Sequence, residues 1–314
     1  MAFVTRGVRA AAAAVVAAAF VAATTPAAAQ EGVSVARCRA LTYFNVFSIG
    51  DLHLESTTVS GPLAVGGDAR LSRVDVNSGG TCDAAALRPW LPALAVSGRL
   101  HARGGSVKAG PVILRRGVWL GPTVKRECAD VLHGPIDFDG LAASHLQRHG
   151  VICARREELC RTKVNNNGDI TMTARQAVSP SGIAAVATCI VRAEDLARAK
   201  RVSLEGRRGL QVAVVKVVGN RRRGDKVLTL ANVEFKGMDA IFVAIVLCDV
   251  PSLVIDDVEV PAALVGPSTH LSGASGVLHG TVVARSLRGR LTFRHEPTDC
   301  GRLRPAKASR APRI

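Results

Sequence analysis

Aromatic residues are scarce in this sequence. Its 314 residues include one Tyr, two Trp and eight Phe, so that aromatics make up 4% of the chain. Proteins that bind single-stranded nucleic acid interleave aromatic side chains with basic ones, because the bases stack on the aromatic rings. The basic clusters here have no such aromatic partners, and we therefore expect no specific nucleic-acid ligand.

Several catalytic and metal-binding signatures are also missing. No CxxC pair offers a thiolate zinc site, and no GxSxG places a serine nucleophile on a strand-to-helix turn. The acidic residues are scattered, without the compact carboxylate cluster of a polysaccharide lyase. The sequence therefore predicts a non-enzymatic protein with no catalytic residue, cofactor or metal.

Four short patterns resemble sites, and each has an ordinary explanation. His145 and His149 have the i,i+4 spacing of zinc ligands, but no Glu completes HExxH, and surface or edge histidines explain them better. Three acids crowd one predicted strand and are candidate calcium ligands: Asp256, Asp257 and Glu259. A solvated strand end explains them better. The tripeptide RGD at 223–225 reads as an exposed turn, and His295-Glu296 as the closure of a last coil.

Only the first residues contain a long apolar run. Arg6 and Arg9 precede "AAAAAVVAAAFVAA" and a small-residue end, which predicts a signal peptide over 1–29 with cleavage after Ala29. An N-terminal membrane anchor is the alternative. The next most apolar segment, 238–250, is short and closed by an acid and a proline, so we expect core strands and no transmembrane segment after signal removal.

The cysteine content supports export. Eight cysteines follow the predicted cleavage site, an even number suited to an oxidising compartment, and we expect up to four disulfides of unassigned pairing. The candidates are Cys38, Cys82, Cys128, Cys153, Cys160, Cys189, Cys248 and Cys300. We therefore expect an extracellular or cell-surface protein.

The charge is strongly basic. The chain carries 41 Lys and Arg against 25 Asp and Glu, a net charge of +16, most of it arginine spread over the chain. A basic exported protein attracts acidic glycans, anionic lipid or wall polymers. Codon bias in a GC-rich genome explains the arginine equally well.

Short β-type runs broken by glycine dominate residues 41–135 and 201–295. "LAVGG" at 63–67 recurs 31 residues later as "LAVSG" at 94–98. Adjacent glycines weaken a strand but suit a corner, and self-similar short strands predict a solenoid whose stacked coils bury their apolar side chains together. The fold class is therefore mainly β: a β-solenoid or β-helix-like stack of short strands with Gly-rich corners.

The middle of the chain adds helical and hairpin signals. A helix is predicted after Pro135, capped by Asp137 or Asp139, and we expect it to cover a sheet or solenoid end. "KVNNNGDITMT" at 163–173 predicts a hairpin, and "RAEDLARAK" at 192–200 a short helix. One or two short helices are thus expected to cap the solenoid.

Both ends of this β-rich region resemble the choice-of-anchor A domains. "FNVFSIGDL" at 44–52 and "GPLAVGGDARL" at 61–71 resemble the family's opening; "HGTVVARSLRGRLTFRHEP" at 279–297 resembles its closing. The clearest matches are Asn45, Phe47, Gly50, Asp51, Gly61, Gly66, Gly67, Gly280, Ser286, Leu287, Gly289, His295 and Pro297. Residues 163–225 match poorly, Thr298 replaces the family's final Phe, and the cysteines are unusual.

The resemblance implies an exported, surface-associated adhesive domain over 30–300, followed by a basic disordered tail at 301–314. The last residues show no apolar tail or LPxTG-like signal, so we expect a chain released or held on a surface by charge. The predicted function is non-catalytic adhesion to acidic polysaccharide, cell-wall or matrix polymers. A carbohydrate-active enzyme on a β-helix scaffold is the alternative; ice binding would need a flat ladder of threonines, which the sequence does not show.

Overall fold

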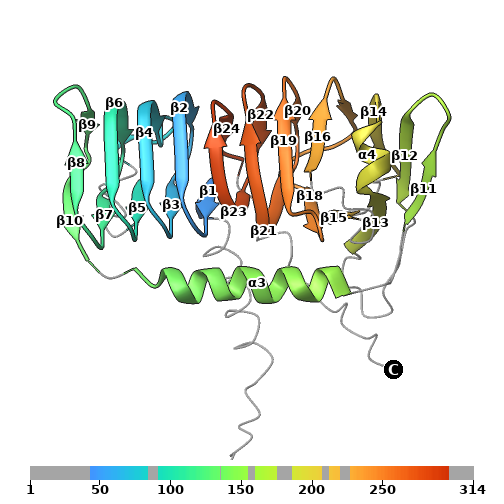
Figure 1. Cartoon of the computed structure of the whole chain (residues 1–314), viewed down its shortest axis with the longest axis horizontal. Helices are drawn as coiled ribbons and strands as arrows, with labels where there is room; N and C mark the ends of the chain where they lie inside the picture. Colours follow the sequence, from blue (N-terminus) through green and yellow to red (C-terminus); the bar gives the residue numbers. More distant parts are fainter. Residues whose placement is uncertain are drawn as a thin grey trace, which may run out of the picture.

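The computed structural model describes residues 43–83, 91–134, 136–154, 160–174, 186–206, 212–219 and 227–296. The predicted signal peptide, the basic tail, Cys38, Cys300 and the RGD tripeptide lie outside these ranges. The described chain confirms the predicted class: it is mainly β, and its strands coil into a solenoid (Figure 1). None of its helices is both long and apolar enough to span a bilayer.

The first half of the chain forms coils from short parallel strands. They are β1 (Val46–Ser48), β2 (Leu52–Val59), β3 (Leu63–Val65), β4 (Ala69–Val76), β5 (Leu94–Val96), β6 (Leu100–Lys108), β7 (Val112–Leu114), β8 (Val118–Leu120), β9 (Lys125–Glu127) and β10 (Val131–His133). Helix α3 (Phe138–Ala154) then carries the chain beneath the stack to its other end (Figure 1).

The second half begins at that end and winds back. It contains β11 (Cys160–Val164), β12 (Asp169–Ala174), β13 (Val186–Arg192), α4 (Ala193–Ala197), β14 (Arg201–Glu205), β15 (Val212–Val218), β16 (Val227–Ala231), β17 (Glu234–Lys236), β18 (Val243–Cys248), β19 (Ser252–Asp256), β20 (Glu259–Val260), β21 (Ala263–Gly273), β22 (Val277–His279), β23 (Val282–Gly289) and β24 (Thr292–Arg294). The predicted hairpin is β11–β12, which is antiparallel, and the predicted short helix is α4.

The coils meet in the middle of the stack. Strand β1 pairs in parallel with β3 on one side and with β23 on the other, so the first coil is stacked directly on the last. Asn45 strengthens this seam, because its side-chain amide donates to the carbonyls of Gly280 and Arg294. The seam joins the two segments that carry the sequence resemblance.

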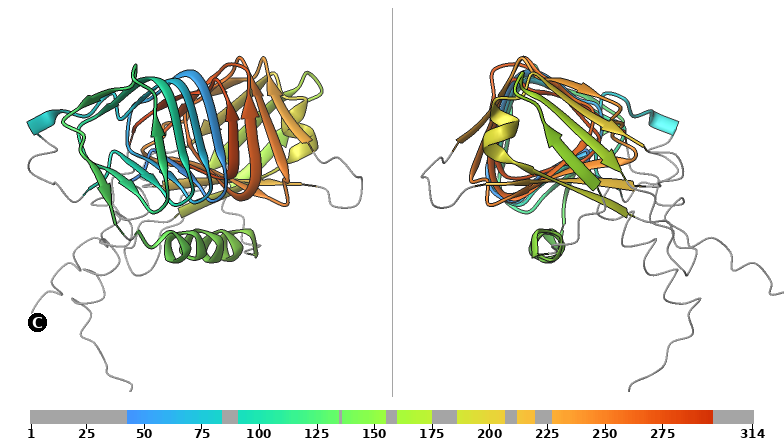
Figure 2. Two further views of the ribbon diagram at one scale, coloured as in Figure 1. Left: turned by 60° about the vertical axis from the view of Figure 1, so that its left-hand side comes forward. Right: turned by 90° about the vertical axis from the view of Figure 1, so that its right-hand side faces the viewer.

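Each coil contributes to three faces, visible end-on in Figure 2. Face A consists of β1, β3, β5, β7, β10, β13, β15, β18 and the first parts of β21 and β23. Face B consists of β8, β16, β19, the first parts of β2, β4 and β6, and the second parts of β21 and β23. Face C consists of β9, β20, β22, β24 and the second parts of β2, β4 and β6.

Glycines form the corner between faces A and B, as the repeated "LAVGG" and "LAVSG" predicted. A Cβ added to Gly67 would lie 2.2 Å from Asp51 Oδ1, and one added to Gly98 would lie 2.3 Å from the Gly67 carbonyl oxygen. The preceding coil therefore approaches too closely for any side chain here. Asp51 and Asp68 secure the corner by accepting backbone N–H groups of the following coil, at Asp68 and Arg99.

Helix α3 covers a face, whereas we expected it to cap an end. Asp137 caps it by accepting the Gly140 N–H at 2.8 Å. At about 1.5 Å per residue the helix is about 25 Å long, enough to cross about five strands. Phe138, packed with Leu141 and Ala142, buries the outward side chains of face A: Phe47, Ala64, Ala95, Val265 and Val283. The apolar outer surface of face A explains why the helix lies there.

Helix α4 does lie near an end of the stack. It follows β13 and packs against β16, in the position that a strand of face B would occupy in that coil. Face B therefore ends at α4 on this side. On the other side it ends at β8, which pairs with β6.

Candidate functional site

The predicted disulfides form where both partners are described. Cys82 pairs with Cys128, Cys153 with Cys248 and Cys160 with Cys189. The second bond joins the C-terminal end of α3 to the end of β18. It therefore fastens the helix to face A.

The two histidines of α3 do not form a metal pair. His145 is buried against Phe47, with ring centroids 5.0 Å apart, and burial together with the nearby Arg148 charge lowers its pKa to about 4. His149 Nε2 instead lies 2.7 Å from the Leu247 carbonyl oxygen. Both residues hold the helix on face A.

Within the described ranges, one group of three or more His, Cys, Asp or Glu has ligand atoms within 4.8 Å of one another. It comprises His149, Cys153 and Cys248, and its two cysteines share a disulfide, which leaves no thiolate for a metal. The acids considered for calcium are not gathered into such a group. Asp257 adopts φ 52° and its N–H bonds to Ser275 Oγ at 3.1 Å, while the Glu259 carboxylate takes part in ion pairs on face C.

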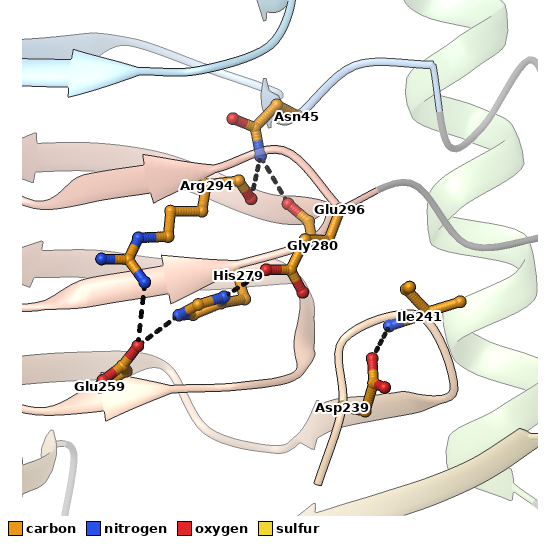
Figure 3. Close-up of polar contacts among 8 residues, drawn as sticks. All are labelled: Asn45, Asp239, Ile241, Glu259, His279, Gly280, Arg294 and Glu296. Atoms are coloured by element: carbon orange, nitrogen blue, oxygen red, sulfur yellow. Dashed lines mark hydrogen bonds and ion pairs between the residues drawn. The ribbon is translucent and has the colours of Figure 1, made fainter. Parts of the chain in front are cut away.

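Glu259 belongs to a cluster that ties three successive coils (Figure 3). His279 lies between two carboxylates, with Nε2 2.7 Å from Glu259 Oε1 and Nδ1 2.8 Å from Glu296 Oε1. Both ring nitrogens of His279 are therefore in contact with a carboxylate. Arg294 Nη1 adds a contact of 3.3 Å to Glu259. Because both ring nitrogens are engaged, the cluster holds the three coils together.

His295 packs across the seam, in agreement with the expected closure of the last coil. A Cβ on Gly61 of the first coil would lie 2.4 Å from the His295 ring, so glycine is required there. Burial lowers the pKa of His295. Of the two residues for which an active site was considered, His295 supports the join between the two halves, and Glu296 pairs with His279 within the second half.

Face B is the face on which the strand register gathers basic side chains. Its middle outward positions follow one another across the stack, and four consecutive ones form what we call the basic row. The row consists of Arg288, His53, Arg70 and His101, and it continues to Trp119. Neighbouring positions are about 4.8 Å apart, the spacing of paired strands.

The basic row is accessible. Arg288, Arg70 and His101 are exposed, and Trp119 is 49% exposed although it is a large apolar residue. The indole lies beside His101, with ring centroids 6.2 Å apart. Glu55 is the acid nearest the row, 3.1 Å from His53 Nε2, whereas Arg103 and Arg290 are exposed on the same face. An open groove lined by His53, Glu55, Arg288 and Arg290 marks one end of the row.

The other half of face B lacks this charge. Continuing from Arg288 toward α4, the same row reads Ser272, Val254 and Thr229. The basic row is thus confined to the seam and the coils on its N-terminal side. Sequence reasoning missed it, because its members are separated by 17, 31 and more than 200 residues; the coil period of 31 relates only Arg70 to His101.

The chain was compared with known families and proteins. The model of a family described as an ice-binding-like adhesive domain matches residues 38–295. No curated protein and no solved structure matches the chain.

Proposed function

Because the chain belongs to the family of ice-binding-like adhesive domains, we propose that it adheres without catalysis to acidic polysaccharides or wall polymers through face B. The observation that carries this proposal is the register that aligns Arg288, His53, Arg70 and His101. The two exposed arginines of this row attract a polyanion, and the arginine fork suits carboxylates.

The proposal favours a charged polymer over ice as the adhesion target. Ice contact would call for a regular ladder of threonines, and on the middle row of face B only Thr229 is a threonine among the positions from β16 to β8. The positions beside the seam carry positive charge instead. The narrower assignment to choice-of-anchor A domains is part of this proposal, and it rests on the motifs at 44–71 and 279–297.

We further propose that the protein acts outside the cell, as residues 30–300 after removal of the signal peptide, with 301–314 as a basic tail. Three disulfides support this location, because such bonds persist in oxidising compartments.

The test is retention of the full chain on immobilised polygalacturonate and heparin in a salt gradient. Exposed charge pairs are screened over about 10 Å at 0.1 M salt. We expect elution well below about 0.5 M salt, and earlier elution for a variant with Arg70→Ser and Arg288→Ser. The matched control, Arg161→Ser with Lys163→Ser, removes two exposed charges from β11 at the far end of the stack. Equal shifts in both variants, salt-insensitive retention or polymer turnover would each overturn the proposal.

A further inference from the structure

The basic row restricts the shape of its ligand. Its positions advance perpendicular to the strands, along the axis of the stack, one coil at a time. The spacing is about 4.8 Å between neighbouring strands. A ligand that contacts the whole row must therefore be linear, and its negative charges must lie opposite Arg288 and Arg70, which are two strands apart.

The side chains restrict the chemistry of the ligand. Arg288 and Arg70 present planar guanidinium groups, which bind carboxylates through two parallel hydrogen bonds. Trp119 continues the row beyond His101 with an exposed indole. The apolar C–H face of a sugar ring packs on such a ring system by dispersion. A single aromatic residue at the end of the row does not provide the interleaved stacking that a nucleic acid uses.

We infer that face B binds a linear polyuronate, laid along the stack axis with carboxylates against Arg288 and Arg70 and one sugar ring against Trp119. This inference rests on the proposed function and names its ligand class. A chain of linked uronic acids carries one carboxylate on each ring, so its negative charges recur at regular intervals along a linear polymer.

The neutral continuation of the row fits the same ligand. Beyond Arg288, Ser272 and Thr229 offer hydroxyl groups and Val254 an apolar surface. Asp256, exposed two residues further along β19 from Val254, is the acid beside this part of the row. Glu55 lies beside the row and pairs with His53, so the contact at His53 is weaker than those at the arginines.

The first experiment is calorimetric titration of the full chain with oligogalacturonates of two to ten rings at low salt. The row offers five positions from Arg288 to Trp119. We expect affinity to rise with each added ring up to about five rings and then to level off. Affinity that continues to rise in proportion to length, or that is already maximal for two rings, would contradict a bound chain in register with the coils.

The second experiment uses variants that preserve the fold. Arg70→Lys keeps the charge but removes the planar fork, so it should weaken oligogalacturonate binding roughly fivefold. Trp119→Ala should weaken binding of five-ring oligomers severalfold but not that of three-ring oligomers. Val118→Ala, a change to the neighbouring exposed residue, is the control.

The outcomes separate the two proposals. If dextran sulfate and polygalacturonate bind equally and Arg70→Lys behaves as the native chain with both, adhesion to polyanions through face B stands and the polyuronate inference is wrong. If neither polymer is retained, both are wrong. Preference for polygalacturonate together with the length dependence supports the inference.

Discussion

Faces A and B come from the same coils and differ in the side chains that point outward. Those of face A are Phe47, Ala64, Ala95 and Val283, which lie under α3. Those of face B include Arg288, His53, Arg70 and His101, which no element covers among the described residues. Strands buried on both sides are continuously apolar, whereas strands with one solvated side alternate. In this solenoid, face A therefore contributes to stability by packing under α3, whereas face B stays open to a ligand.

The largest expected effect comes from releasing the cover of face A. Replacing Cys153 and Cys248 together by serine removes a bond that closes a loop of 95 residues. Loss of a disulfide with so long a loop should lower the free energy of unfolding by about 4 kcal/mol, measured by urea denaturation. The C-terminal turns of α3 should also exchange their amide hydrogens faster.

The control for this variant is the pair Cys82→Ser and Cys128→Ser. That disulfide has a loop of 46 residues and joins coils far from the C-terminal end of α3. It should cost stability without accelerating exchange in α3. Equal exchange rates in α3 for both variants would show that the Cys153–Cys248 bond does not hold the helix on face A.

The next effect compares two positions in the same coil. Phe47 is 2% exposed beneath α3, and Phe47→Ala should lower the free energy of unfolding by about 3–4 kcal/mol, because it removes a large side chain and leaves a cavity. His53→Ala on face B should change it by less than about 0.5 kcal/mol. Urea denaturation of both variants tests this, and similar losses would remove the distinction between the faces.

The sequence pattern predicted where the strands lie better than it predicted which face each residue joins. "LAVGG" and "LAVSG" lie in register, as Leu63 opposite Leu94, because corner glycines and coil length are local properties. A residue with left-handed backbone resets the alternation in β16: Val227 and Thr229 are exposed, but Asn232 has φ 56°, and Val233 after it is buried.

Long-range placement could not be read from the sequence. The apolar side of α3 indicates that the helix packs against another element, but the same pattern fits packing on the end of a solenoid or on one of its faces. The pairing of β1 with β23 joins residues more than 230 positions apart, and no local pattern specifies such a partner. The basic row depends on this seam, since Arg288 reaches His53 only across it.

A smaller effect than that of Phe47 should appear in acid, again on face A. Burial and Arg148 hold the pKa of His145 at about 4, below its unfolded value of about 6.5. As the pH falls from 6.5 to 4, the unfolded chain takes up a proton at this site while the folded chain does not, so stability is lost over that range. The loss amounts to about 3 kcal/mol.

The measurement is urea denaturation at pH 7.5 and at pH 4, for the native chain and for His145→Phe. Other groups, including His295 with its lowered pKa, contribute equally to both proteins. The variant should therefore lose less stability than the native chain between these two pH values. The same loss in both would mean that His145 is not buried in its neutral form.

The smallest expected effect on stability, and the clearest on binding, is at Arg70. This exposed residue lies in the middle of the basic row, between His53 and His101, and its own strand pairs on both sides through backbone groups that the substitution leaves intact. Arg70→Ser should change the free energy of unfolding by less than about 0.5 kcal/mol, since a surface change away from caps and buried networks costs little. Retention on polygalacturonate should nevertheless fall, because the cation that links the two ends of the row is gone. Unfolding and retention must therefore be measured on the same preparation: a variant that loses both would place Arg70 among the residues that hold the coils together, and the separation of roles between the two faces would not stand.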